Sequence, residues 1–179
     1  MARFGMAIDT TKCVGCMDCV VACKTENNVP EGFNRDWIVY DAKGKFPTIQ
    51  MEIRSERCNH CDNPPCVDCC PTGASHVQDF GQVVLVEKDL CIGCKACIAA
   101  CPYDARFVHP EGYVDKCTFC MHRVEQGLDP ACVAVCPTHC MTFGDLDDPN
   151  STISRLLNSR KNHVLIPEAG TKPRIHYLV

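Results

Sequence analysis

Cysteine spacing constrains this 179-residue chain more than any other feature of its sequence. Sixteen of the 18 cysteines fall into four groups of four, and three of the groups end in Cys-Pro. In chain order the groups are Cys13, Cys16, Cys19 and Cys23; Cys58, Cys61, Cys66 and Cys70; Cys91, Cys94, Cys97 and Cys101; and Cys117, Cys120, Cys132 and Cys136. The first and third groups have the C-x2-C-x2-C-x3-C spacing in which three thiolates bind one iron-sulfur cubane and the fourth binds a neighbouring cluster. We therefore expect the chain to fold around iron-sulfur clusters.

Two other uses of cysteine compete with this interpretation. Disulfide frameworks occur in small secreted chains, but here three half-cystines would crowd into seven residues. The first cysteine, at position 13, also leaves no room for a secretory leader with its apolar segment. Zinc sites are built from pairs of C-x2-C pairs. That pattern fits the first and third groups poorly, and the fourth group, taken alone, somewhat better.

Composition and charge agree with a protein filled by clusters. Aromatic residues make up only 7% of the chain, and metal ligation can supply folding energy that apolar burial would otherwise provide, so we expect the apo chain to be poorly folded. The formal charge is −4, and four oxidised clusters of about −2 each would take it to about −12. No basic block is present, which disfavours a nucleic-acid partner. No apolar stretch approaches the roughly 18 residues of a membrane span, so membrane association is expected only through a partner.

Basic residues stand next to several ligands. Lys12, Arg57 and Lys116 each precede the first cysteine of a group, and Lys88 lies three residues before Cys91. Cations and hydrogen bonds beside a cluster tune its reduction potential. Ordinary solvated charges at strand ends are the alternative for each of them.

A short extended segment, a ligand run and a Cys-Pro turn recur along the chain, as in a bacterial two-cluster ferredoxin. The pattern predicts an α+β fold of two ferredoxin-like 2x(4Fe-4S) modules with loop insertions. The second and third groups form a module over residues 58–107, inserted into an outer module over 1–57 and 108–145 that carries the first and fourth groups. A C-terminal helix and extended tail occupy 146–179, and all parts are expected to form one compact unit.

Exchange of fourth ligands within each pair of groups predicts four quartets. They are Cys13, Cys16, Cys19 with Cys136; Cys117, Cys120, Cys132 with Cys23; Cys58, Cys61, Cys66 with Cys101; and Cys91, Cys94, Cys97 with Cys70. Lys24, and not proline, follows Cys23. The ligand role of Cys23 therefore depends on spacing alone.

Four motifs carry a resemblance that covers most of the chain. They are Cys13-Val14-Gly15-Cys16 through Cys23-Lys24-Thr25-Glu26-Asn27, Cys58-Asn59-His60-Cys61-Asp62-Asn63-Pro64-Pro65-Cys66, Cys101-Pro102-Tyr103-Asp104-Ala105-Arg106, and Lys116-Cys117-Thr118-Phe119-Cys120. Together they resemble the four-cluster ferredoxin-like (beta) subunits of molybdenum or tungsten bis-pterin oxidoreductases, such as polysulfide, thiosulfate, arsenate and dimethyl sulfoxide reductases. The segment 142–149 is most similar to the polysulfide and thiosulfate reductase B branch.

The resemblance implies an electron-transfer subunit of anaerobic respiration with no catalytic site of its own. Its four 4Fe-4S clusters would relay electrons between a pterin catalytic subunit, facing the first and fourth groups, and a membrane quinone-interacting subunit. Nitrate-reductase relatives lack the second cysteine of the third run, whereas this chain keeps Cys94. The implied location is the membrane periphery, on the periplasmic face by co-export with a signal-bearing partner; the cytoplasmic face is the alternative. A free polyferredoxin is the alternative function, and no catalytic signature of another enzyme class is present.

Four residues near the ligands and two further segments remain. Cys69 could compete with Cys70 for ligation, and Cys140 is expected to be a buried apolar residue. His60 and His122 are expected to be hydrogen-bonded neighbours of the clusters and not ligands. Residues 25–57 predict a surface loop or ribbon suited to partner contacts. Asn150 or Ser151 would cap a helix with apolar residues on one face, and the tail behind it would lie on a partner subunit.

Overall fold

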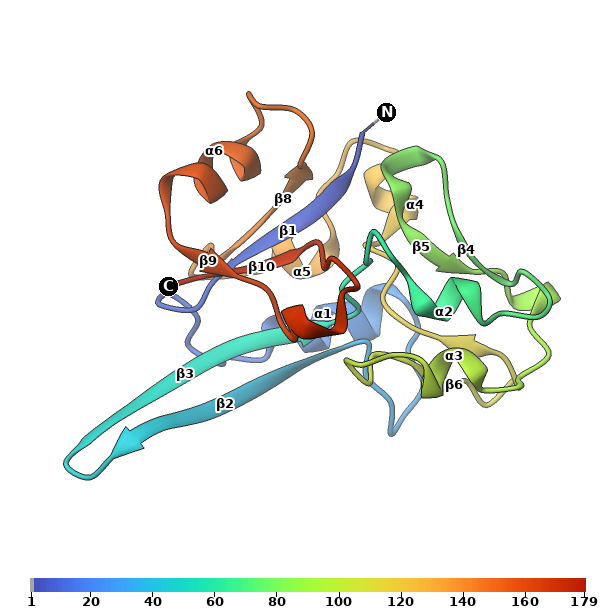
Figure 1. The fold of residues 1–179 in the computed structure, drawn as a ribbon, viewed down its shortest axis with the longest axis horizontal. Coiled ribbons are helices and arrows are strands. Elements are labelled where there is room, and N and C mark those ends of the chain that lie inside the picture. Colours follow the sequence, from blue (N-terminus) through green and yellow to red (C-terminus); the bar gives the residue numbers. More distant parts are fainter. Residues whose placement is uncertain (1) are drawn as a thin grey trace.

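The computed structural model describes residues 2–179, in which the two ends of the chain meet in one sheet (Figure 1). The strand order is β8 (Met141–Asp145), β1 (Phe4–Asp9), β10 (Ile175–Leu178) and β9 (Asn162–His163). Strand β1 runs antiparallel to β8 and parallel to β10. The expected position of the tail was therefore wrong: its apolar side chains are buried in the chain's own sheet.

Helix α6 (Thr152–Ser159) covers this sheet (Figure 1). Its N-cap is Ser151, whose hydroxyl oxygen accepts a hydrogen bond from the backbone N–H of Ser154 at 3.1 Å. Ile153 is fully buried with Ala7 and Leu178. It also packs on Gly144 of β8, where an added Cβ would stand 3.1 Å from the Ile153 side chain. The predicted cap and apolar helix face are confirmed.

The other helices are short, and most of them carry predicted ligands. They are α1 (Asp18–Glu26), α2 (Pro65–Asp68), α3 (Ala96–Ala99), α4 (Met121–Val124) and α5 (Ala131–Ala134), with single 3-10 turns at η1 (Phe80–Gln82), η2 (Lys88–Leu90) and η3 (Pro167–Ala169). Helices α2, α3 and α5 have four residues each, and each precedes a Cys-Pro pair. Helix α1 continues for nine residues. Proline cannot continue a helix, and it follows the closing cysteine in the three short cases. The residue after Cys23 is Lys24, so α1 can continue.

Three two-stranded hairpins complete the α+β structure. Two are small: β4 (Ser75–Val77) with β5 (Val84–Val86), and β6 (Phe107–Val108) with β7 (Val114–Asp115). The third, β2 (Asp36–Lys45) with β3 (Thr48–Arg57), extends away from the body of the molecule (Figure 1). The ribbon predicted between the first two cysteine groups is therefore present. The division into nested modules stays a prediction.

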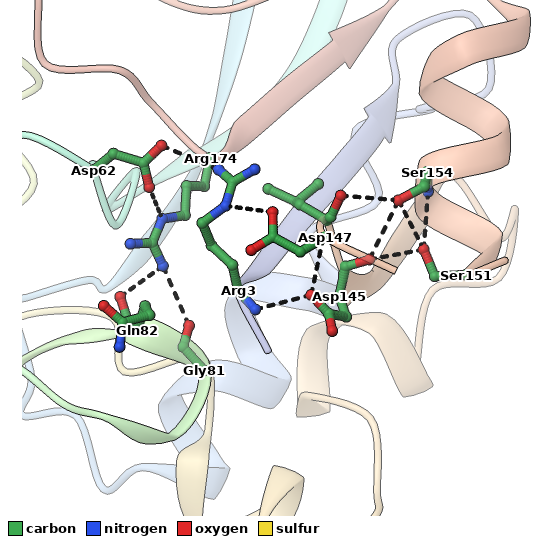
Figure 2. Close-up of polar contacts among 10 residues, drawn as sticks. Arg3, Asp62, Gly81, Gln82, Asp145, Asp147, Ser151, Ser154 and Arg174 are labelled. Atoms are coloured by element: carbon green, nitrogen blue, oxygen red, sulfur yellow. Dashed lines mark hydrogen bonds and ion pairs between the residues drawn. The ribbon is translucent and has the colours of Figure 1, made fainter. Parts of the chain in front are cut away.

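An arginine network joins the chain ends to the loop that follows Cys61 (Figure 2). Arg174 is buried, and it donates to Asp62 at 2.5 Å and to the carbonyl of Gln82 at 2.6 Å. Arg3 also donates to Asp62, at 3.0 Å. The backbone of Arg174 donates to the carbonyl of Asn59. The C-terminal segment therefore holds the second cysteine group in place.

A membrane-crossing helix, long and apolar throughout, does not occur in residues 2–179.

Replacing Ile153 with Ala tests the packing of α6. The lost contacts and the cavity should lower the free energy of unfolding by about 2 to 5 kcal/mol. The measurement is the denaturant midpoint of the cluster-loaded chain under anaerobic conditions. Arg155→Ala, on the exposed side of the same helix, is the control, and equal midpoints for the two variants would contradict the packing.

Candidate iron-sulfur sites

The four predicted quartets are the candidate cluster sites, numbered in the order in which side-chain contacts connect them. Each is named by its predicted quartet: site 1, Cys13, Cys16, Cys19 and Cys136; site 2, Cys23, Cys117, Cys120 and Cys132; site 3, Cys58, Cys61, Cys66 and Cys101; site 4, Cys70, Cys91, Cys94 and Cys97.

Sites 2 and 4 are cavities lined by all four of their predicted cysteines. In each, about 310 Å³ of space free of protein atoms, part of it open to solvent, lies between the lining residues. Cys23 from α1 joins the three cysteines of the fourth group in site 2, and Cys70 joins the third group in site 4. Cys69 does not line site 4. Both gatherings match the predicted exchange of fourth cysteines, and ligation by these residues remains our proposal.

The thiols of site 3 also lie close together. Burial, together with the nearby charges of Cys58, Cys66 and Cys101, raises the pKa of Cys61 to about 12. Burial likewise raises the pKa of Cys19 and of Cys23 to about 12. Such thiols hold their protons at neutral pH, so binding iron at these sites must release protons.

Site 1 reaches the surface through one of its cysteines. Cys16 is exposed, whereas Cys19 is buried beside Ser55. Cys140 is buried as expected, but its sulfur lies 3.4 Å from that of Cys136. A hydrogen bond with Cys140 also lowers the pKa of Cys13 to about 6. Cys13 and Cys136 therefore meet at Cys140, a contact that sequence reasoning missed because no ligand spacing includes this residue.

Glycine is required in the loop of site 1. Gly15 has φ +68°, and a Cβ there would stand 2.6 Å from the hydroxyl of Tyr40. The reason is a left-handed backbone conformation pressed against the β2–β3 hairpin.

Buried cations contact the cysteine sulfurs. Arg57 donates to Cys132 Sγ at 2.8 Å, and Arg106 donates to Cys66 Sγ at 2.8 Å. Lys116, also buried, donates to the carbonyls of Val84 and Cys117. Of the four cations noted in the sequence, Lys12 and Lys88 are exposed and Arg57 and Lys116 are buried. Arg106 was missed as a cation, although it closes the Cys101 motif.

The charges of these cations fit anionic clusters. Arg57 pairs with Asp36 at 3.2 Å. Within residues 2–179, Arg106 and Lys116 have no carboxylate within the 4.0 Å of an ion pair. A buried cation without a counter-charge is costly. A cluster of negative charge at site 3 would supply the missing counter-charge for both.

Unpartnered polar atoms give a second test of fit. In the described chain, both polar side-chain atoms of Asn59 and both ring nitrogens of His60 are buried without a hydrogen-bond partner. Such groups normally find partners, and N–H groups beside clusters donate to sulfur. That His60 is a hydrogen-bonded neighbour of a cluster stays a prediction, and its two unpartnered ring nitrogens agree with it. His122 lies near the surface, 2.7 Å from Glu26.

Side chains also connect neighbouring sites. Ser55 links Cys19 of site 1 to Arg57 at Cys132 of site 2. The imidazole of His60, beside site 3, stacks at 3.8 Å on Phe119 of the site 2 loop. Arg106 donates to Cys66 of site 3 and to Ser75, whose backbone N–H donates to Cys70 of site 4 at 3.3 Å. These contacts connect the predicted sites in the order 1, 2, 3, 4, and we call this series the row of sites.

The choice between adjacent cysteines can be tested by iron analysis. Cys70→Ala should lose iron and the EPR signal of one cluster, because a site 4 thiolate is removed. Cys69→Ala should keep the full content, about 16 irons for four cubanes. Iron loss in the Cys69 variant alone would reverse the ligand assignment.

Arg106→Gln should lower the reduction potential of the cluster at site 3, because a buried cation stabilises the more negative reduced state. EPR-monitored redox titration of the complex measures this shift. Arg106→Lys should shift the potential less, and the exposed Lys88→Gln hardly at all, since solvent screens its charge. Equal shifts for Arg106→Gln and Lys88→Gln would contradict this role.

The sequence of this chain is similar to those of known iron-sulfur proteins. Two family models, each described as a 4Fe-4S dicluster domain, match residues 12–74 and 49–146. Protein NrfC of Escherichia coli is 46% identical over 97% of this chain and 79% of its own length. The B subunit of polysulfide reductase from Wolinella succinogenes is 43% identical, over 97% of this chain and 92% of its own length. The arsenate respiratory reductase iron-sulfur subunit ArrB of a Shewanella species is 37% identical, over 98% of this chain and 96% of its own length. These matches confirm the resemblance, and the chain belongs to the 4Fe-4S dicluster family of iron-sulfur electron-transfer subunits.

Proposed function

We propose that this chain relays electrons through four 4Fe-4S clusters, between a molybdenum or tungsten bis-pterin catalytic subunit and a membrane quinone-interacting subunit. Bound clusters would supply one-electron transfer, and all sixteen cysteines of sites 1 to 4 would hold them. Relatives named as reductase subunits support the two partners.

The exposure of two predicted ligands supports a role as an electron relay. Of the sixteen predicted ligands, only Cys16 in site 1 and Cys94 in site 4 are exposed. These are the two ends of the row of sites, while sites 2 and 3 lie inside it behind buried arginines and stacked rings. A row with two exposed ends and a protected middle suits a subunit that accepts electrons from one partner and delivers them to another.

Location follows from the partners. We propose a peripheral subunit at the membrane, on the periplasmic face through co-export with a signal-bearing partner, with the cytoplasmic face as the alternative. A free-standing polyferredoxin remains the second candidate function, since it would use the same cysteines. The long β2–β3 hairpin favours the complex, because extended surface segments commonly serve contacts.

Anaerobic affinity purification from the native membrane fraction tests the relay. We expect a large subunit that contains molybdenum or tungsten and a hydrophobic subunit to elute with this chain. About 16 irons per chain should accompany them. A chain that elutes alone with the same iron content would be the polyferredoxin.

A further inference from the structure

The β2–β3 hairpin has two chemically different faces. Side chains alternate along paired strands, and cross-strand partners place Tyr40 opposite Ile53 and Ala42 opposite Met51 on one face. We call Tyr40, Ala42, Ile49, Met51, Ile53 and the turn residue Phe46 the apolar strip. The other face carries ion pairs, such as Lys43 with Glu52 at 2.5 Å and Arg54 with Glu56 at 2.7 Å. These charged side chains pair with one another within the hairpin, whereas the apolar strip has no such internal partner.

The inner end of the same face covers the cysteine sites. Asp36 and Arg57 form a cross-strand pair there, as do Ile38 and Ser55. Ser55 lies 3.8 Å from Cys19 of site 1, and Arg57 reaches Cys132 of site 2. Each of these polar residues is buried. The face that shields sites 1 and 2 thus continues outward as the apolar strip.

The outer half of that face is exposed. Tyr40 is 52%, Ile49 58%, Met51 59% and Phe46 89% exposed. An isolated two-stranded ribbon is only marginally stable in water, and large apolar and aromatic side chains are typical of the cores of protein interfaces. Exposure of such a row along one face indicates that another molecule covers it.

The apolar strip is continuous with the exposed end of site 1. The Tyr40 hydroxyl donates to the carbonyl of Gly15 at 3.2 Å. Gly15 adjoins Cys16, and the side chains of Val14 and Met17 on either side are exposed. A molecule seated on the strip therefore also covers Cys16, the point where site 1 reaches the surface.

The length of the hairpin limits which kind of molecule can cover the apolar strip. Each strand has ten residues, which at about 3.3 Å per residue is roughly 33 Å. Covering its outer half requires a partner that rises well beyond the body of this chain. A large globular subunit can do so, whereas a loop that projects only a short way from a membrane cannot. A lipid bilayer would have to accommodate the ion pairs of the opposite face, which is costly.

We propose that the apolar strip, with Val14 and Met17, is the docking surface for the catalytic subunit and fixes that subunit over Cys16. The assignment rests on the proposed function, and it adds which residues of this chain hold the partner. The hairpin acts as an arm that keeps the partner's electron-exchanging group next to site 1.

Neighbouring substitutions on opposite faces test this arm within the intact complex. Met51→Lys places a charge in the strip, and Gln50→Lys places the same charge one residue away on the polar face. The complex is purified through a tag on this chain. The amount of catalytic subunit that co-purifies with the Met51 variant should fall by roughly tenfold or more relative to wild type, as expected when the core of an interface is disrupted. The Gln50 variant should match wild type, and both should keep the hydrophobic subunit. Ile49→Lys with Thr48→Lys is a second matched pair.

Iron content and EPR spectra of each variant establish that the chain is folded. Full retention of the catalytic subunit by both strip variants would overturn the proposal, and so would selective loss of the hydrophobic subunit. A wild-type chain that forms dimers disrupted by Met51→Lys would assign the strip to a second copy, and would also overturn it. If wild type brings no catalytic subunit at all, the proposed function itself fails, and the docking surface fails with it.

Discussion

The meeting of each cysteine run with a fourth cysteine from a distant part of the chain is the constraint on which the rest of the structure depends. In site 2, Cys23 joins cysteines that begin at position 117, and in site 4, Cys70 joins those that begin at 91. Most of the helices between them are single turns ended by Cys-Pro, so they cannot hold these distances alone. Metal ligation by these cysteines would close the loops, and it would couple folding to cluster binding.

Charge provides the second organising principle. Arg57, Arg106 and Lys116 are buried among cysteine sulfurs, and only the first has a carboxylate partner in the described chain. Their burial is favourable when the sites carry negative clusters, because each cation then faces an anion in a medium of low dielectric. Arg57 and Arg106 also connect neighbouring sites, through Ser55 and Ser75, whereas the stacked rings of His60 and Phe119 connect sites 2 and 3.

Sequence reasoning predicted much of the local structure and less of what lies between segments. The cap at Ser151, the strands before the ligand runs and the helix ends at Cys-Pro follow from neighbouring residues, and the structure contains them. The tail was misplaced, because an extended segment gives no sign of which strand it pairs with. The contacts of Cys140 and Arg106 with the sulfurs of predicted ligands were not predicted, because they depend on how the chain packs in three dimensions.

By itself, the sequence determined the class of cofactor and the family, because the spacing of cysteines within a run is a local property that iron-sulfur ligation requires. Tertiary structure alone decided which cations become buried, and that β10 joins the N-terminal strand. It also decided that one face of the β2–β3 hairpin shields two sites at its base, while the outer half of that face is exposed to solvent. These features depend on contacts between residues far apart in the chain, and such contacts leave no periodic signal in the sequence.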